Sequence, residues 1–335
     1  TAAPEEDPFA VLDDLPAVGE GARGAVGGGW FGVLGFALGH RVEHLDAGPP
    51  RPRPRPASDL AYYDHLLRLD ADGAWWFESL AAPDREDAVE RRLAELVERA
   101  RDGVPAPRPY AVSPWRPVPG LDGHARAVAV CRERIHAGDL FQANVCLRLQ
   151  ATLEGDALDL WTDAAAALRP DRAAWLAGDH GAIASLSPEL FLERRGRRVR
   201  TAPIKGTRRR PDNAAAAAAE RDALLASGKD RAENTMIVDL ARNDLGRVCR
   251  PGSVRVPVMA EARPHTGVWH LVSEVEGDLR AGIGDADLLR ATFPPASVTG
   301  APKIAALDVI AELESTGREA YTGAIGFASP LAGLE

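Results

Sequence analysis

Strand-like and helix-like segments follow one another in this chain in an order that excludes a regular alternation. Residues 181–205 hold consecutive strand-like runs, and two of these flank a tight hairpin turn centred on Gly196. Two helical patterns, 214–226 and 230–245, then follow with no strand between them. Successive βαβ units would need a strand at that point, so the order favours an α+β fold over a doubly wound sheet.

The other segments fit the same class. A strand is expected over 30–36, two strands flank a turn at 72–73, and a single strand is expected over 141–149. Strand-like runs also lie at both ends of 253–277. Helical spacing of apolar residues predicts further helices at 87–101, 121–136, 156–168, 285–293 and 302–313.

Length and proline content indicate how the chain is divided. A chain of 335 residues is too long for one small core and suits two domains or one domain with two lobes. Prolines are frequent within 104–120, so we expect a linker there. It would separate an N-terminal region at 1–103 from a second domain at 121–335.

Composition excludes several classes of protein. With 45% apolar and 27% charged residues the chain is globular rather than disordered. A net charge of −9 argues against nucleic acid as a partner, and three cysteines without metal-site spacing argue against a disulfide framework. The longest apolar stretch, 30–38, is far shorter than the ~20 residues that span a membrane. We therefore expect a cytoplasmic protein with no membrane partner.

Lysine is so rare in this chain that each one is informative. Of 40 basic residues only Lys205, Lys229 and Lys303 are lysines. A buried lysine can release its proton, whereas arginine cannot. Lys205 lies between an apolar strand and Gly206-Thr207, where burial would lower its pKa and free the amine as a nucleophile or base. The alternative is a lysine at a strand end that extends its ammonium into water.

Two further residues are candidate acid–base groups. Glu189 lies sixteen residues before Lys205, and the turn at Gly196 puts both at the same end of the hairpin. Its carboxylate can hold the amine or take its proton. The alternative is an exposed cross-strand pair worth ~0.2–1 kcal/mol. His270 lies on a predicted strand, and a lone histidine there is by itself more typical of a hydrogen-bonded core residue than of a catalyst.

One predicted helix presents several carboxylates. Within 230–245, Glu233 and Asp244 flank an apolar stripe on one face, so at least one of them should point into a cleft. Asp230, one turn before Glu233, could enlarge a site for Mg²⁺, which takes one or two carboxylates together with waters and substrate oxygens. The alternative makes Asp230 an N-cap and Glu233 a favourable charge in the first turn.

Six motifs resemble, in the same order, the chorismate-binding domain of the chorismate-utilising enzymes. They are GDLFQAN at 138–144, SPE at 187–189, PIKGT at 203–207, AENTMIVDLARND at 232–244, HLVS at 270–273 and SVTGAPK at 297–303. Anthranilate, aminodeoxychorismate, isochorismate and salicylate synthases share this domain. The resemblance runs from about residue 123 to the end, with a weaker match at 30–39. It implies an α+β fold with two large antiparallel sheets stacked face to face and helices outside.

Two positions distinguish the members of this family. The residue between Pro-Ile and Gly-Thr is alanine in anthranilate synthases and lysine in aminodeoxychorismate synthases, and here it is Lys205. The position of Gln142 holds a water-activating lysine in isochorismate and salicylate synthases, and glutamine cannot replace it. The pair therefore resembles the aminodeoxychorismate synthases, which serve p-aminobenzoate and folate synthesis.

The resemblance implies a magnesium and substrate site. Mg²⁺ would bind through Glu233, next to which the helix spacing adds Asp230, and would hold a carboxylate of chorismate. Gly206, Thr207 and Tyr321 would lie near the substrate.

It also implies a reaction. Lys205 would attack C2 of the chorismate ring while the 4-hydroxyl leaves as water, and ammonia would then enter at C4 and expel Lys205. Glu189 and His270 would act as acid–base or positioning groups. The ammonia would come from a glutamine amidotransferase, either a separate subunit or a fused domain, because no cysteine of this chain has the context of a glutaminase nucleophile.

Both ends of the sequence depart from the family pattern. The family domain continues beyond a position equivalent to Glu335 with an arginine strand, a glycine-rich loop and an acidic helix, and the first strands are also missing. We therefore expect a fragment that is inactive and aggregation-prone by itself, because missing strands expose sheet edges. An anthranilate synthase-like enzyme and a non-catalytic chorismate-binding remnant stay open as alternatives.

Overall fold

The computed structural model describes residues 7–19, 21–45, 48, 49, 55–80, 83–101, 103 and 106–335. Its α-helices are α1 (Leu38–Val42), α2 (Glu86–Arg101), α3 (Leu121–Ala137), α4 (Ala157–Leu168), α5 (Ala214–Ala226), α6 (Gly228–Gly246), α7 (Asp285–Thr292) and α8 (Lys303–Leu313). Short 3₁₀ helices are η1 (Ala10–Asp13), η2 (Pro83–Arg85) and η3 (Ala296–Val298). The seven predicted helices are confirmed as α2 to α8, whereas spacing does not predict the five-residue α1.

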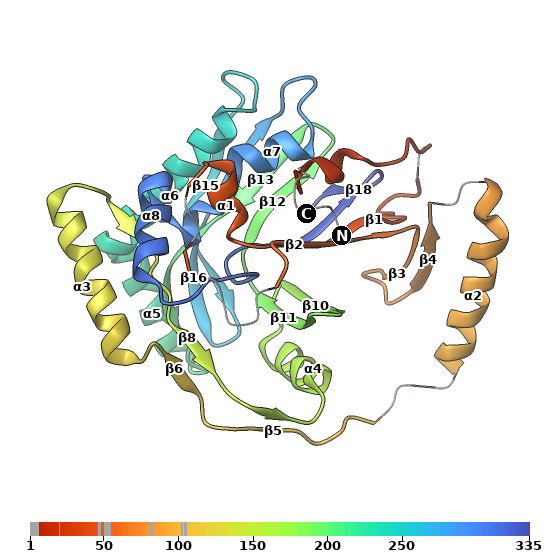
Figure 1. Ribbon diagram of the computed structural model, residues 1–335, viewed down its shortest axis with the longest axis horizontal. Coiled ribbons are helices and arrows are strands. Elements are labelled where there is room, and N and C mark those ends of the chain that lie inside the picture. Colours follow the sequence, from red (N-terminus) through yellow and green to blue (C-terminus); the bar gives the residue numbers. More distant parts are fainter. Residues whose placement is uncertain are drawn as a thin grey trace.

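Nine strands of the described chain form one large antiparallel sheet (Figure 1). From one edge to the other their order is β14 (Ile204–Arg209), β16 (Val268–Asp278), β13 (Arg198–Ala202), β12 (Leu190–Arg195), β19 (Gly333–Leu334), β18 (Ala324–Ser329), β1 (Gly29–Leu34) and β2 (Ser58–Tyr63), and β15 (Arg255–His265) also pairs with β16. The sheet is antiparallel, and strands β12 to β14 follow one another in the sequence without helices. Helices therefore do not alternate regularly with strands, which confirms the expected α+β fold.

The remaining strands of the described chain form two-stranded antiparallel ladders. They are β3 (His65–Leu69) with β4 (Trp75–Ser79), β5 (Ala111–Val112) with β9 (Leu153–Glu154), β6 (Arg116–Val118) with β8 (Arg148–Gln150), β7 (Gln142–Ala143) with β17 (Gly300–Ala301), and β10 (Arg172–Gly178) with β11 (Gly181–Ser187). Of the two large sheets that the resemblance implied, the described chain therefore shows one, and these ladders are separate from it.

The proline-rich segment expected to be a linker contributes to two of these ladders. Its first two residues, 104 and 105, lie outside the described part of the chain. Further along, β5 pairs with β9 and β6 pairs with β8. The division into an N-terminal region and a second domain stays a prediction, although β1 and β2 lie in the same sheet as strands from the predicted second domain.

The single strand expected over 141–149 is wrong. Residues 142–143 and 148–150 are strands, and the segment between them is not. The physical reason lies in its backbone partners. The amide of Asn144 donates to the Thr299 carbonyl at 2.8 Å, and the amide of Cys146 donates to Glu314 Oε1 at 2.8 Å. With these groups bound to a loop and a side chain, the segment has no ladder to join.

Helix α6 lies against the large sheet and carries much of the core. Ile237, Val238 and Leu245 are buried on its inner face, and the helix packs on β14 and β16. A buried polar contact fixes its position: Ser273 Oγ on β16 donates to Asn234 Oδ1 at 2.5 Å. The helix begins at Ser227, whose side chain accepts from the amide of Asp230. The expectation that Asp230 is the N-cap is therefore wrong, because Ser227 takes that place.

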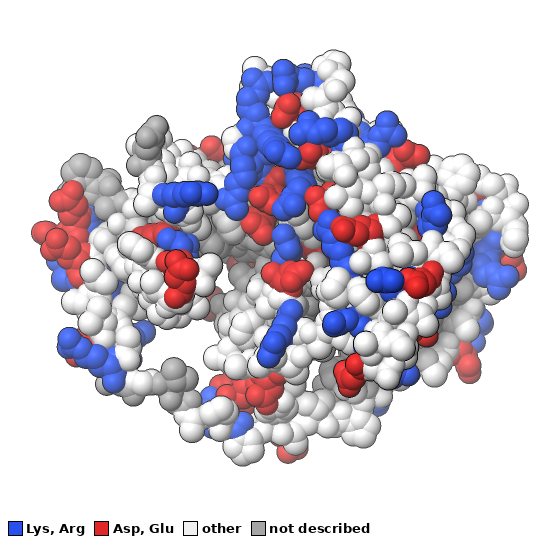
Figure 2. Space-filling view, turned by 180° about the vertical axis from the view of Figure 1, so that it is seen from behind, with Lys and Arg blue, Asp and Glu red and all other residues white. Residues whose placement is uncertain are grey.

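Several of the many arginines form ion pairs across the large sheet. Arg200 on β13 contacts Glu193 and Glu274 at 2.5 and 3.6 Å. Arg263 on β15 lies 2.6 Å from Glu274 and 2.7 Å from Glu261. The basic side chains in Figure 2 are accordingly interspersed with acidic ones on the face shown there.

Candidate functional site

The hairpin of β12 and β13 brings Glu189 to Lys205. Glu189 comes directly before β12, and Lys205 is the second residue of β14, which follows β13 without a helix. Glu189 Oε1 accepts a hydrogen bond from the amide of Ile204 at 3.1 Å. The predicted proximity of Glu189 and Lys205 therefore follows from strand connectivity.

Lys205 is held by a loop that is distant in the sequence. Its Nζ donates to the backbone carbonyl of Ser297 in η3, and Ser297 is only 7% exposed. Burial lowers the pKa of Lys205, while the charges of Glu189 and Glu233 raise it. Burial at this site thus favours the neutral amine relative to water, while the charges of two carboxylates favour the ammonium.

Glu189 experiences the opposite effect. Burial raises the pKa of its carboxyl group, while hydrogen bonds from Ser297 and Ile204 and the charge of Lys205 lower it. A carboxyl group whose pKa is raised can exchange a proton with a neighbouring amine more readily than an exposed one. Glu189 and Lys205 are therefore arranged as a coupled acid–base pair.

Replacing Glu189 by glutamine should make Lys205 more reactive at a given pH. Glutamine keeps a carbonyl oxygen for the amide of Ile204 but removes the charge that raises the pKa of Lys205. The pKa of Lys205 should fall further, so labelling of its amine should begin at lower pH. Peptide mass spectrometry after reaction with an amine reagent at a series of pH values measures this. Lys229, 81% exposed, is the internal reference. The expectation would be contradicted if, relative to Lys229, the pH at which Lys205 is labelled stayed the same or rose.

Helix α6 supplies the two carboxylates predicted to bind metal. Glu233 lies one turn after Asp230, on the side that faces Lys205, and its Oε1 is 3.6 Å from Lys229 Nζ. Asp230 packs on Gly206: a Cβ added to Gly206 would lie 3.0 Å from Asp230 Cβ. Gly206 also has a φ of +94°, which favours glycine. The α6–β14 contact thus places both carboxylates beside the Lys205-Gly206 backbone.

Mg²⁺ fits this arrangement in part. Asp230 and Glu233 are three residues apart on one helix, so their carboxylates lie on the same side. One or two carboxylates, completed by waters and substrate oxygens, is the usual pattern for Mg²⁺. Within the described residues, no group of three or more His, Cys, Asp or Glu side chains is placed to hold a metal ion. Substrate oxygens would therefore have to supply further ligands.

Thr207 and His270 meet across the sheet. They face each other in the β14–β16 register, and Thr207 Oγ1 lies 2.9 Å from His270 Nδ1. Burial lowers the pKa of His270, and neighbouring His265, whose ring centroid is 4.9 Å away, lowers it further. A neutral His270 can accept a proton or orient the threonine hydroxyl.

Tyr321 lies apart from these contacts. It is 60% exposed, and its amide donates to the carbonyl of Arg318 at 3.1 Å. The structure thus brings Glu189, Lys205 and Glu233 into one cluster, joins Asp230 to Gly206 and Thr207 to His270, and leaves Tyr321 on a neighbouring surface.

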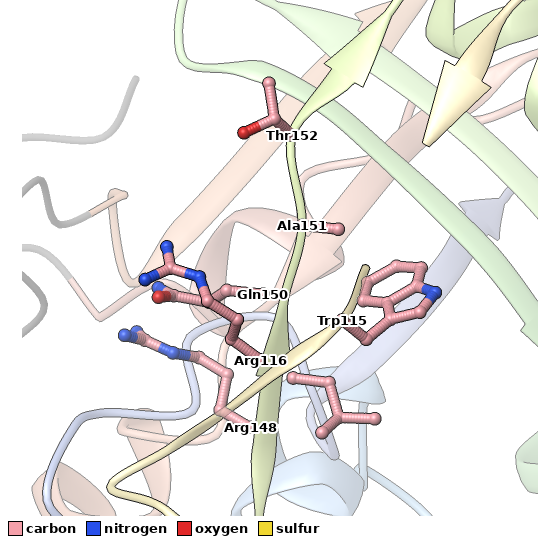
Figure 3. Close-up of a pocket in the computed structure, with 7 residues that line it drawn as sticks. Trp115, Arg116, Arg148, Gln150, Ala151 and Thr152 are labelled. Atoms are coloured by element: carbon pink, nitrogen blue, oxygen red, sulfur yellow. The ribbon is translucent and has the colours of Figure 1, made fainter. Parts of the chain in front are cut away.

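A surface pocket of the described chain does not coincide with this site. It has a volume of about 430 Å³ and lies on the β6–β8 ladder, between Trp115 and Thr152. Figure 3 shows Arg116, Arg148 and Gln150 on one side of the ladder and Trp115 on the other. Its side chains diverge, so we place the candidate site at Lys205 instead.

Sequence reasoning missed three features around the site. Ser297 contributes its carbonyl to Lys205, Arg318 and Glu314 form a buried pair behind it, and Asp244 pairs with Lys303 at 2.7 Å. The rarity of lysine could have drawn attention to Lys303. Its ion pair with Asp244 accounts for both side chains, so Asp244 need not point into a cleft. Nothing in local spacing indicates the tertiary contacts of Ser297. No helix of the described chain is both long and apolar enough to cross a membrane.

Comparison with known proteins agrees with this geometry. A family model described as chorismate binding enzyme matches residues 4–335. Aminodeoxychorismate synthase component 1 of Klebsiella aerogenes is 40% identical over 302 residues, which are 90% of this chain and 65% of that protein. Anthranilate synthase component 1 of Streptomyces coelicolor is 38% identical over 326 residues, which are 90% of this chain and 62% of that protein.

A solved structure supports the fold. The crystal structure of anthranilate synthase component I from Streptococcus pneumoniae TIGR4 matches with a TM-score of 0.86 at 27% identity, over 98% of this chain and 75% of that one. The chain spans 65% of the length of the curated relative from Klebsiella aerogenes. The motifs, the fold and these relatives agree, and the chain belongs to the chorismate binding enzyme family.

Proposed function

We propose that this chain carries the chorismate site of an aminodeoxychorismate synthase, in which ammonia replaces the 4-hydroxyl of chorismate. The observation that carries this proposal is the environment of Lys205, whose amine donates to the Ser297 carbonyl and whose pKa is lowered by burial against the charges of Glu189 and Glu233. The position of Lys205 in PIKGT supports the same member of the family, and so does the identity to the Klebsiella aerogenes protein.

The chemistry requires a free amine at Lys205. Lys205 attacks C2 of the ring as the neutral amine, the two conjugated ring double bonds shift, and the 4-hydroxyl leaves as water with the proton released by the amine. Ammonia then attacks C4, the C2–nitrogen bond breaks, and the ammonia proton returns to Lys205. Burial lowers the pKa of the lysine and so provides the neutral amine that the first step needs.

The neighbours of Lys205 have complementary roles in this proposal. Glu189 accepts or returns the proton that Lys205 loses or gains, since it is hydrogen-bonded to the adjacent amide. His270 and Thr207 orient the substrate from β16 and β14, and Gly206 allows α6 to pack close to this strand. Tyr321 would contact the far side of the substrate.

Magnesium is the proposed cofactor. Glu233, with Asp230 beside it, would hold Mg²⁺ against a substrate carboxylate. When bound, Mg²⁺ supplies positive charge that stabilises negative charge on the substrate. The protein side chains would keep the carboxylate oriented and exclude water.

Ammonia is proposed to come from a glutamine amidotransferase, as a separate subunit or a fused domain. The name of the Klebsiella aerogenes relative, a component 1, fits a second component. A cytoplasmic location for both follows from the biosynthetic role that we propose.

Product analysis tests the proposal. The chain, and the complete product of its gene, would be incubated with chorismate, Mg²⁺ and ammonium at alkaline pH. We expect 4-amino-4-deoxychorismate, identified by liquid chromatography and mass spectrometry, and p-aminobenzoate after a lyase is added. Anthranilate as the main product of the complete gene product would contradict the proposal.

A second candidate, anthranilate synthesis, is favoured by one specific observation. The Streptomyces coelicolor and Streptococcus pneumoniae proteins that this chain resembles are both anthranilate synthase components. That reaction adds ammonia at C2, where Lys205 would stand in the way of the incoming nitrogen. The same chromatogram therefore separates the two candidates.

A further inference from the structure

The ion pair between Arg318 and Glu314 lies behind the loop that holds Lys205. The side chains are 3% and 8% exposed. Arg318 Nε donates to Glu314 Oε2 at 2.9 Å, and its Nη2 donates to Oε1 at 2.6 Å. The two parallel contacts form a fork that a lysine cannot reproduce. Phe36 covers the guanidinium, which lies 4.4 Å from the ring centroid.

The pair holds two chain segments together. Arg318 Nη1 donates to the Val298 carbonyl at 2.9 Å, and Nη2 also donates to the Asn144 carbonyl. Glu314 Oε1 in turn accepts from the amide of Cys146 at 2.8 Å. Asn144 closes the connection, because its Nδ2 donates to the same Val298 carbonyl at 3.2 Å. Loops that are about 150 residues apart in the sequence thus share one buried arginine.

These segments lead directly to the candidate site. Val298 follows Ser297, whose carbonyl accepts from Lys205 Nζ and whose hydroxyl bonds to Glu189. At the other end, the carbonyl of Arg318 accepts from the amide of Tyr321 at 3.1 Å. A displacement of Arg318 would therefore reach both Ser297 and Tyr321.

We propose that Arg318, held by Glu314, is a positioning residue that sets the place of the Ser297 carbonyl and of Tyr321, and through them the place of the Lys205 amine. Its catalytic consequence rests on the function proposed above. The one guanidinium bonds to Val298, Asn144 and Glu314 at once, so its removal would take away three contacts to these segments together. A shift of about 1 Å in a reacting group can cost about 10²-fold in rate.

The scarcity of lysine makes a direct test practical. Protein labelled with ¹³C at the lysine ε-carbon should give three side-chain signals, from Lys205, Lys229 and Lys303, and Lys205→Met assigns the first. In Arg318→Gln, which removes the guanidinium without adding a lysine signal, the signal of Lys205 should move while that of Lys229, 81% exposed, should not. Glu314→Gln keeps one acceptor oxygen and should move the Lys205 signal in a milder background.

A matched control separates positioning from stability. Arg194 forms a similar ion pair with Asp285, whose side chain is 2% exposed, and contacts no candidate site residue. Arg194→Gln should lower the melting temperature and leave the Lys205 signal in place. If Glu314→Gln and Arg318→Gln also leave that signal in place while the protein is folded, the proposal is overturned, and the pair is structural only.

Activity gives the second readout. In the complete gene product, Arg318→Lys should lower kcat by about 10- to 100-fold, with KM for chorismate changed less, because Gly206, Thr207 and His270 on β14 and β16 stay in place. An equal change in kcat for Arg194→Lys would contradict the proposal. Absence of aminodeoxychorismate from the unmodified protein would refute the proposed function alone, since the lysine signals test the positioning without turnover.

Discussion

Lys205→Ala should abolish aminodeoxychorismate formation or slow it by roughly 10³-fold or more, as expected when a covalent nucleophile is removed. The alanine cannot form the C2 adduct. The other two lysines are engaged elsewhere, because Lys229 is exposed beside Glu233 on α6 and Lys303 is paired with Asp244. The measurement is the initial rate of product formation by the complete gene product with saturating chorismate and ammonium.

Lys205→Arg distinguishes a nucleophile from a simple cation. Arginine keeps the positive charge next to Glu189 and Glu233 but does not lose its proton in a protein. It should be as inactive as alanine if the amine attacks the ring, and partly active if Lys205 only binds a carboxylate. Lys229→Arg is the matched control and should retain full activity. Omitting ammonia should also allow a covalent adduct on the Lys205 peptide to be found by mass spectrometry.

Lys303→Met should have the largest effect on stability, about 3–5 kcal/mol less free energy of unfolding. Lys303 Nζ donates to Asp244 Oδ2 at 2.7 Å and to the Thr292 carbonyl at 2.8 Å, and both charged side chains are less than 15% exposed, at 11% and 14%. Methionine fills similar volume but leaves the Asp244 carboxylate buried without a partner. Urea unfolding followed by circular dichroism measures the difference.

The deficit should depend on pH with a defined sign. Burial raises the pKa of Asp244, and Lys303 opposes this rise. Without the lysine the folded-state pKa of Asp244 rises further above its unfolded value. Asp244 then becomes neutral in the folded protein as pH falls through that raised pKa, so the deficit of Lys303→Met should shrink at lower pH and grow at higher pH.

A double variant and a control variant complete the test of the Lys303–Asp244 pair. Lys303→Met with Asp244→Leu should recover much of the loss, because it removes both charges together. Arg242→Met breaks an exposed pair with Asp239 on the same helix and should cost about 0–1 kcal/mol. A loss for Lys303→Met no greater than that of Arg242→Met would show that the buried pair contributes little.

Local patterns were sufficient for most elements. The α2 to α8 helices follow from apolar spacing, and the β12–β13 hairpin follows from the turn at Gly196, because both depend on residues a few positions apart. The proximity of Glu189 to Lys205 could be predicted for the same reason: a hairpin returns the chain to its starting end. The interruption of the strand expected over 141–149 could not be predicted in this way, since Asn144 and Cys146 bond to groups more than 150 positions away.

Contacts between distant segments had to come from the tertiary structure. Serine and aspartate are both common N-caps, and Ser227 and Asp230 lie only three positions apart, so residue type does not choose between them. Ser227 is the N-cap of α6 because its hydroxyl accepts from the amide of Asp230. The pairing of Asp244 with Lys303, the Ser297 carbonyl at Lys205 and the fork of Arg318 on Glu314 all depend on packing of η3 and α8 against α6 and β14.

By itself the sequence determined the α+β class, the resemblance to the chorismate-utilising enzymes and the candidate residues from Glu189 to His270, because motif order and residue type carry that information. Only the tertiary structure decided which of these side chains lie together and in which direction the pKa values of Glu189, Lys205 and His270 shift. Glu189, Lys205 and Glu233 meet because α6 packs on the sheet, and burial at that junction lowers the pKa of the lysine. Desolvation depends on every atom around a group, and no local pattern of residues contains those atoms.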